Sequence, residues 1–150
     1  MKLHLVAVGR LKSGPERALM NDYLKRLPWP LTETEVEERR PLEGPQRQMR
    51  EGELLLKAVP PAALLVALDA GGVMLSSQAF AEKLAAWQDQ GRDVAFVIGG
   101  ADGHAPDVLA RADFKLSLGA MTWPHALARV LLVEQLYRAH AILAGHPYHK

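Results

Sequence analysis

Three segments of the chain carry glycine at or just beyond the end of a run of strand-forming residues. They are Leu68–Gly72 (LDAGG), Gly99–Gly103 (GGADG) and Gly119–Pro124 (GAMTWP). Glycine lets backbone amides approach a ligand closely, and in parallel α/β sheets ligands bind beyond the carboxyl ends of the strands. Each segment by itself has the composition of an ordinary turn. Taken together, the three segments favour one ligand pocket at the end of a sheet.

The spacing of these glycines excludes several familiar sites. Gly99, Gly100 and Gly103 do not form G-x-G-x-x-G, and the sequence contains neither G-x-x-x-x-G-K-[ST] nor G-x-S-x-G. A usual dinucleotide fold, a P-loop and a serine-hydrolase elbow are therefore not expected. The six histidines show no zinc spacing, H-E-x-x-H is absent and there is no cysteine, so no metal site is expected.

A second group of chemically able side chains lies near the carboxyl terminus. The closing GHPYHK carries Tyr148, His149 and Lys150, and a basic, aromatic strip of this kind can meet the phosphates and bases of RNA. A frayed, solvent-facing tail is the plainer interpretation of the same composition. Arg129 has no obvious partner on its own helix, which makes it a candidate for binding an anion.

The segments that must position these groups alternate between strand and helix patterns. Apolar, β-branched runs predict buried strands, among them Lys2–Gly9, Ala63–Asp69 and Asp93–Gly100. Apolar residues at helical spacing predict helices between them, and the charged stretch Leu31–Arg40 is typical of an edge strand. The alternation indicates a single α/β domain over residues 1–150, with a mostly parallel sheet and helices on both faces.

The last predicted helix, from Pro124 to about Ala144, is apolar on nearly every side. A helix of this kind must be covered on more than one face. The sheet covers one face, and a second copy of the chain is the economical cover for another. A helix wedged deep in its own core is the alternative. The pattern favours a homodimer.

Composition sets limits on the function. The 150 residues are 49% hydrophobic and 23% charged, and 18 Lys and Arg stand against 17 Asp and Glu, for a formal net charge of +1. A uniformly basic nucleic-acid coat is excluded, although a local basic patch is not. The apolar run of the amino-terminal MKLHLVAVGR is too short for a signal peptide, and no stretch suits a bilayer span. A cytoplasmic protein with no membrane partner is therefore expected.

Five stretches together resemble one protein family: KLHLVAVG, VALDAGG, DVAFVIGGADG, LSLGAMTWPHALARVLLVEQLYRAHAI and HPYHK. They resemble the small bacterial SPOUT-class methyltransferases that modify N3 of a pseudouridine in large-subunit ribosomal RNA. The combination of T-x-P-H-x-x-x-R-V-x-x-x-E-Q-x-Y-R-A with a terminal Y-H-K is specific, and the likeness is weakest from Leu31 to Val59. The resemblance implies a homodimer whose α/β fold is threaded as a carboxyl-terminal trefoil knot, a rare exception to un-knotted connections.

The resemblance also implies a cofactor, S-adenosylmethionine, and the residues that hold it. By matching motifs, the cofactor contacts fall on Leu68, Gly99, Gly119, Ala120, Met121, Thr122, Trp123 and Pro124. Two of these positions depart from the family pattern, because Leu or Phe is expected at Trp123 and Ser is common at Gly119. Both departures change side chains more than backbone, so they bear on loop packing rather than on cofactor binding.

The implied reaction needs alignment of the methyl donor with the acceptor and loss of the N3 proton. The tail residues Tyr148, His149 and Lys150 would reach toward the RNA and the partner's cofactor. His149 or His125 is the candidate for assisting proton loss, and Arg129 with Lys150 is the candidate for holding the nucleotide. Because the net charge is near zero, ribosomal RNA in an assembled large subunit or 70S ribosome is the expected substrate rather than naked RNA. A non-catalytic dimeric module that binds ribosomes or a nucleotide is the alternative function.

Overall fold

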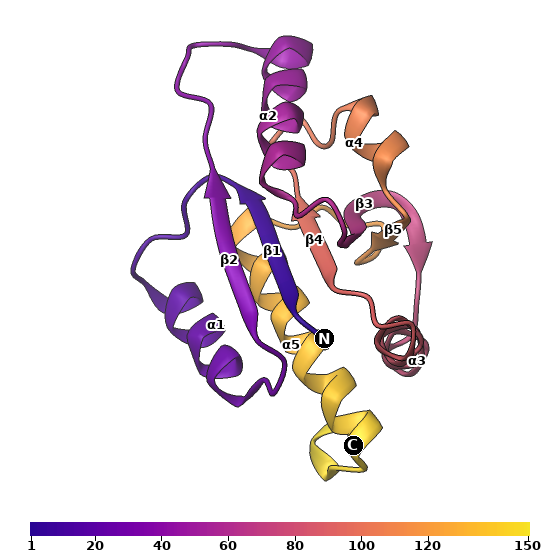
Figure 1. Ribbon diagram of the computed structural model, residues 1–150. Helices are drawn as coiled ribbons and strands as arrows, with labels where there is room; N and C mark the ends of the chain where they lie inside the picture. The colour runs from indigo at the N-terminus through magenta and orange to yellow at the C-terminus, as the bar shows by residue number, and fades with distance from the viewer.

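Five parallel strands form one central sheet with the order β2-β1-β4-β3-β5 (Figure 1). The computed structural model describes the backbone of residues 1–150 and every side chain except that of His149. The strands are β1 (Leu3–Val8), β2 (Leu31–Val36), β3 (Leu64–Met74), β4 (Val94–Ile98) and β5 (Phe114–Ser117). The predicted α/β class with a mostly parallel sheet is confirmed. The charged strand β2 lies at one edge of the sheet, as its composition indicated.

Helices cover both faces of the sheet, as predicted. They are α1 (Pro15–Arg26), α2 (Gly44–Ala58), α3 (Ser77–Asp89), α4 (Pro106–Arg111), α5 (His125–Ala144) and a closing 3-10 turn, η1 (Pro147–His149). Side chains alternate along β1, so that Leu3 and Leu5 join the core with α1, α3 and α5, whereas Val6 and Val8 join the core with α2 and α4. Each face of the sheet therefore has an apolar core of its own.

β3 contains a wide bulge toward its carboxyl end. The pairing with β5 shifts register between Leu68 and Val73, so that both residues lie opposite Leu116. A Cβ atom at Gly72 would lie 2.6 Å from the backbone oxygen of Lys115, so the close approach of the two strands requires glycine. The bulged residues form a loop at the carboxyl rim of the sheet.

α5 runs antiparallel to the strands, from the carboxyl rim of the sheet toward its opposite end (Figure 1). Gly145, with a φ of 72°, ends the helix in the left-handed conformation. Val133 and Leu136 are buried in the core that α5 shares with α1 and α3. The protomer itself thus covers much of the helix, whereas Leu127 and Leu143 are 40% and 43% exposed.

Candidate active site

The three glycine-bearing segments lie side by side at the carboxyl rim of the sheet. Leu68–Gly72 lies in the bulge of β3, and the other two segments follow β4 and β5. The three strands are neighbours in the sheet, and together the segments line a cleft of about 270 Å³. Its walls include Leu68, Gly99, Gly119, Met121, Thr122 and Trp123. Ala120 and Pro124 belong to the same loop as the last four of these residues. The structure therefore gathers the predicted cofactor loops around one hollow.

The loop after β5 is tied to the bulge of β3 through one hydroxyl group. Ser117 Oγ donates to the carbonyl of Ala70 at 3.2 Å and accepts from the amide of Gly119 at 3.1 Å. Gly119 has a φ of 117°, a conformation that favours glycine, and a Cβ atom there would meet nothing within 4 Å. Trp123 Nε1 donates to the Leu118 carbonyl at 3.4 Å. These bonds fix the loop and leave open space beside its backbone.

The loop after β4 is a tight turn closed by glycine. The amide of Gly103 donates to the carbonyl of Gly100 at 3.0 Å, and Gly103 has a φ of 77°. His104 follows the turn and is buried, with Nε2 3.2 Å from the carbonyl oxygen of Val97. Burial lowers the pKa of His104 below its usual value, although the hydrogen bond to Val97 opposes the shift. The imidazole is therefore neutral at physiological pH.

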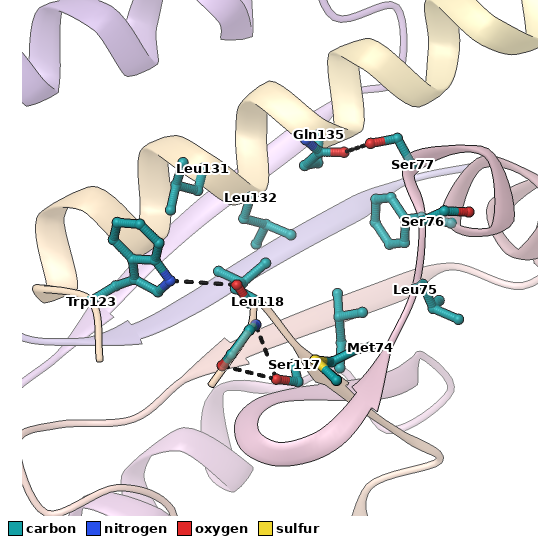
Figure 2. A pocket seen from close by; sticks show the side chains of 13 residues that line it. Met74, Leu75, Ser76, Ser77, Ser117, Leu118, Trp123, Leu131, Leu132 and Gln135 are labelled. Carbon is teal, nitrogen blue, oxygen red and sulfur yellow. Dashed lines mark hydrogen bonds between the residues drawn. The ribbon is translucent and has the colours of Figure 1, made fainter. Parts of the chain in front are cut away.

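A second pocket, of about 340 Å³, lies between α3 and α5 and adjoins the cleft (Figure 2). Leu118, Gly119 and Trp123 line both hollows. At the end of the pocket away from Trp123, Ser77 Oγ donates to Gln135 Oε1 at 2.7 Å (Figure 2). Together the cleft and the second pocket present apolar side chains next to backbone amides and carbonyls that can form hydrogen bonds with a ligand.

The first turns of α5 bring one predicted site residue to the cleft and take another away from it. His125 lines the cleft. Arg129 is only 2% exposed, and its guanidinium lies 3.0 Å from Glu33 Oε2 and 2.5 Å from Glu35 Oε2, while it donates to the carbonyl of Gly9 at 2.8 Å. As expected, Arg129 has no partner on its own helix, but other elements of the fold supply its partners. A role for Arg129 in binding an anion or the nucleotide stays a prediction. The guanidinium that was expected to hold the nucleotide is neutralised by the protein's own carboxylates.

The same carboxylates also bind α1 and the loop before it. Arg17 Nη1 lies 2.7 Å from Glu33 Oε1, and the amide of Leu11 donates to Glu35 Oε2 at 2.6 Å. Burial alone would raise the pKa of Glu35, but the bonds from Leu11 and Arg129 hold that pKa below its usual value. The network joins β2, α1 and α5 into one unit.

The predicted RNA-binding tail lies at the other end of α5 (Figure 1). The helix has 20 residues, and at about 1.5 Å of rise per residue its two ends are about 30 Å apart. Tyr148 and the exposed Lys150 therefore lie far from the cleft of the same protomer. The side chain of His149, the third predicted tail residue, lies outside the described part of the chain.

Tyr148 is docked on its own protomer rather than frayed. Its hydroxyl lies 2.9 Å from that of Tyr23 and 3.2 Å from Glu134 Oε1, and its ring meets Tyr137 at 4.7 Å between centroids. Arg138 pairs with Glu134 and lies over the Tyr148 ring at 5.1 Å. Burial is the main cause that raises the pKa of the Tyr148 phenol well above its usual value, and the hydrogen bond with Tyr23 adds to the shift. Tyr148 is therefore a neutral hydrogen-bond donor at physiological pH.

The residues that the structure describes contain neither a metal-binding cluster nor a membrane-spanning helix. Among them, no group of three or more His, Cys, Asp or Glu side chains is placed to hold a metal ion. No helix in this described part of the chain has both the length and the apolar character of a membrane span.

Residues 1–149 match the family model described as "Predicted SPOUT methyltransferase". The chain belongs to the SPOUT methyltransferase family. Two relatives of this SPOUT methyltransferase are both named Ribosomal RNA large subunit methyltransferase H. The protein from Rhodospirillum centenum is 57% identical and that from Paramagnetospirillum magneticum 56% identical, each over 100% of this chain and 99% of the relative.

A solved structure supports the fold of this SPOUT methyltransferase. It is a probable methylase family protein from Haemophilus influenzae Rd KW20, with a TM-score of 0.58 at 16% identity. The match covers 99% of this chain and 70% of that chain. At this identity the likeness concerns the fold alone.

Two residues beside the cleft of the SPOUT methyltransferase were not indicated by any sequence pattern. His104 belongs to the cleft lining, and Glu51 of α2 is buried against Gly100. Glu51 lies in the stretch where the family resemblance is weakest, and its contact joins residues far apart in the sequence. No local signal could have found it.

Proposed function

We propose that this SPOUT methyltransferase transfers a methyl group from S-adenosylmethionine to N3 of a pseudouridine in large-subunit ribosomal RNA, in the cytoplasm. The names of two relatives more than half identical over their full length support the substrate class, and the motif resemblance supports the N3 position. The observation that carries the proposal is the convergence of the β3 bulge and the loops after β4 and β5 on one cleft.

The cleft suits S-adenosylmethionine in size and in chemistry. Its volume of about 270 Å³, with about 340 Å³ in the adjoining pocket, matches ligand sites of about 300–1,000 Å³. Leu116, Leu118 and Trp123 offer apolar surface for a planar base, and the glycine loops offer backbone donors and acceptors. A Cβ atom at Gly99 would lie 3.1 Å from the backbone of Gly103, so glycine allows the close packing of the turn that forms this wall.

When bound, the cofactor supplies a methyl group already activated on a sulfonium. The chain's own residues must orient the acceptor nitrogen and take up its proton. His125 lines the cleft, which supports a role in accepting that proton. Lys150 can donate hydrogen bonds to the nucleotide, and Tyr148, whose hydroxyl is bonded to Tyr23 and Glu134, can offer its ring to a base. A role for His149 in proton loss stays a prediction.

The tail can complete a site only in a homodimer, because α5 holds it about 30 Å from the cleft of its own protomer. An antiparallel partner helix would bring the tail of one protomer to the cleft of the other. Apolar surface for this contact lies at the start of α5, where Met121, Trp123 and Leu127 are 77%, 42% and 40% exposed. The functional unit is a homodimer with two composite sites.

The test uses large subunits and 70S ribosomes from a bacterial strain that lacks this chain. After incubation with the protein and S-adenosylmethionine, mass spectrometry of the ribosomal RNA should show an added methyl group on a pseudouridine. A variant with Tyr148→Ala, His149→Ala and Lys150→Ala should lose transfer while binding the cofactor with nearly unchanged Kd. Normal transfer by that variant would refute the role of the tail.

The charge of the chain bears on the form of the substrate. At a net charge of +1, attraction to naked RNA is weak, since the affinity for phosphates scales with the charges neutralised. Transfer to assembled particles should therefore be faster than transfer to a deproteinised transcript, and equal rates would contradict this preference. If S-adenosylmethionine showed no saturable binding even at millimolar concentration, the chain would instead act as a non-catalytic ribosome-binding module.

A further inference from the structure

Two buried polar atoms without a hydrogen-bond partner flank the Gly99–Gly100 peptide. Among the described side chains, the buried atoms in this state are Glu51 Oε1 and His104 Nδ1. Glu51 is 4% exposed and His104 is 7% exposed. Buried polar groups without partners are rare in native proteins, because burial removes their bonds to water. Two such atoms beside one cofactor loop point to a role in shaping that loop.

Glu51 is held directly against the loop after β4. A Cβ atom at Gly100 would lie 2.6 Å from Glu51 Oε1 and 2.9 Å from Oε2, so a side chain there would have to displace the carboxylate. Arg47 Nε donates to Oε2 at 3.3 Å. The second oxygen, Oε1, is left to receive a donor from the loop.

α2 supports this loop through two further contacts. Gln48 Nε2 donates to the carbonyl of Asp102 at 2.7 Å. Gly52 lets α2 approach α4 closely, since a Cβ atom there would lie 2.9 Å from that of Ala105. One turn of α2 therefore holds the loop from outside the cleft.

His104 lies against the neighbouring glycine of the same peptide. Its Nδ1 would lie 3.2 Å from a Cβ atom at Gly99. In the tautomer that donates from Nε2 to the carbonyl of Val97, Nδ1 of the neutral ring is an acceptor. The peptide thus lies between two acceptors, and backbone N–H groups are the complementary donors.

We propose that Glu51 is a positioning residue for the methyl donor. When S-adenosylmethionine binds, backbone N–H groups of residues 100–102 turn onto Glu51 Oε1 and fix the loop in its cofactor-holding shape. The inference rests on the proposed function and deepens it. It gives α2 a part in cofactor affinity, although Glu51 itself does not line the cleft.

The test compares Glu51→Gln with Glu53→Gln, a matched change on the exposed side of the same helix, where Glu53 pairs with Arg50. Isothermal titration calorimetry measures the binding of S-adenosylhomocysteine. Glu51→Gln keeps the shape of the side chain but loses the charge that strengthens a hydrogen bond from an amide, so its Kd should rise about tenfold. Glu53→Gln should bind like wild type. At saturating S-adenosylhomocysteine, the amides of residues 100–102 should exchange with solvent faster in Glu51→Gln than in wild type.

A wild-type Kd in Glu51→Gln, or unchanged amide exchange, would overturn the inference. If Glu51→Gln does not fold, crystals of the wild-type protein with S-adenosylhomocysteine decide. A loop N–H within hydrogen-bond distance of Oε1 supports the inference, and an Oε1 still without a partner overturns it. If the wild-type protein binds neither S-adenosylhomocysteine nor S-adenosylmethionine, the proposed function fails, and this inference fails with it.

Discussion

His125 lies where the cleft meets the first turn of α5. Substitution of His125 by Ala should lower kcat for methyl transfer by at least about a hundredfold, since a positioned acid or base contributes about 10²–10⁴ in rate. The Kd for S-adenosylmethionine should change little, because the cofactor loops stay intact. Single-turnover transfer to ribosomes and calorimetry measure the two quantities separately.

His140→Ala is the matched control for this experiment. His140 lies toward the far end of the same helix, against the rings of Trp29 and Tyr137, and its loss should leave the chemical step unchanged. A wild-type kcat in His125→Ala would exclude this residue as the proton acceptor and favour His149 of the partner subunit.

Glu38 fixes the connection between β2 and α2. Its buried carboxylate accepts from the side chain and the amide of Arg40, each at 3.0 Å, and from Arg50 Nε at 2.8 Å. These bonds, led by that from the Arg40 side chain, lower the pKa of Glu38 from 4.5 to about 2. A carboxyl whose pKa is lower in the folded state stabilises the fold fully above its unfolded pKa and loses this effect as pH falls toward the folded pKa.

Glu38→Gln should therefore lower the free energy of unfolding at neutral pH. The difference from wild type should shrink between about pH 4.5 and pH 2, where Glu38 of the wild-type protein becomes protonated. Urea titrations across this range measure it. Glu37→Gln, at the neighbouring and more exposed position, serves as control. A difference that did not vary with pH would contradict the assigned pKa.

At the scale of the elements, Arg129 anchors α5 to the edge strand β2. Arg129→Met should lower the free energy of unfolding by about 2–4 kcal/mol, because it leaves two partly buried carboxylates with Arg17 as their one remaining cation in the network. Denaturant unfolding followed by circular dichroism measures the change. A variant that unfolded like wild type but no longer bound ribosomes would restore the nucleotide-holding role expected from the sequence.

Most elements follow from local patterns, and the structure places them close to their expected bounds. The run Asp93–Gly100 contains β4, and the helix expected from Pro124 to about Ala144 is α5. β3 departs from its pattern, because it was expected to end at Asp69 and continues to Met74. The extension depends on pairing with β5 across a bulge, and such long-range pairing leaves no local periodicity to detect.

The cleft could be predicted from the topology of the sheet. The side-chain contacts around it could not be predicted from the sequence. Parallel strands end at the same rim, so loops after neighbouring strands converge whatever their detailed shape. The partners of Arg129, the burial of Glu51 and the docking of Tyr148 on Tyr23 all join segments far apart in the chain. Threading of the last segment as a trefoil knot stays a prediction from the resemblance.

At the scale of the whole molecule, the exposed apolar start of α5 is the proposed contact between protomers. Leu127→Arg places a charge on this surface, 40% exposed in the protomer, and should convert the dimer to monomers. The Kd for S-adenosylmethionine should stay nearly unchanged, since one protomer builds the whole cleft, while transfer is lost. Analytical ultracentrifugation and calorimetry test both parts. A Leu127→Arg protein active as a monomer would refute the composite site.

Composite sites also predict that two inactive variants restore each other. In Gly100→Ala the new Cβ atom must displace the Glu51 carboxylate from the loop, so this variant is expected to supply a tail without a working cleft. A chain ending at Gly145 supplies a cleft without a tail. After subunit exchange in an equal mixture, each mixed dimer has one working site, so about a quarter of the wild-type activity should return. Continued inactivity of fully exchanged mixtures would contradict the arrangement.

The length of α5 has a kinetic consequence. In the proposed composite site, α5 separates the cleft of each protomer from its own tail, so a single protomer should transfer no methyl groups even when it is fully folded. At protein concentrations below the dissociation constant of the dimer, the rate of methyl transfer per unit volume should fall with the square of the protein concentration. A drop in expression should therefore lower RNA methylation more than in proportion.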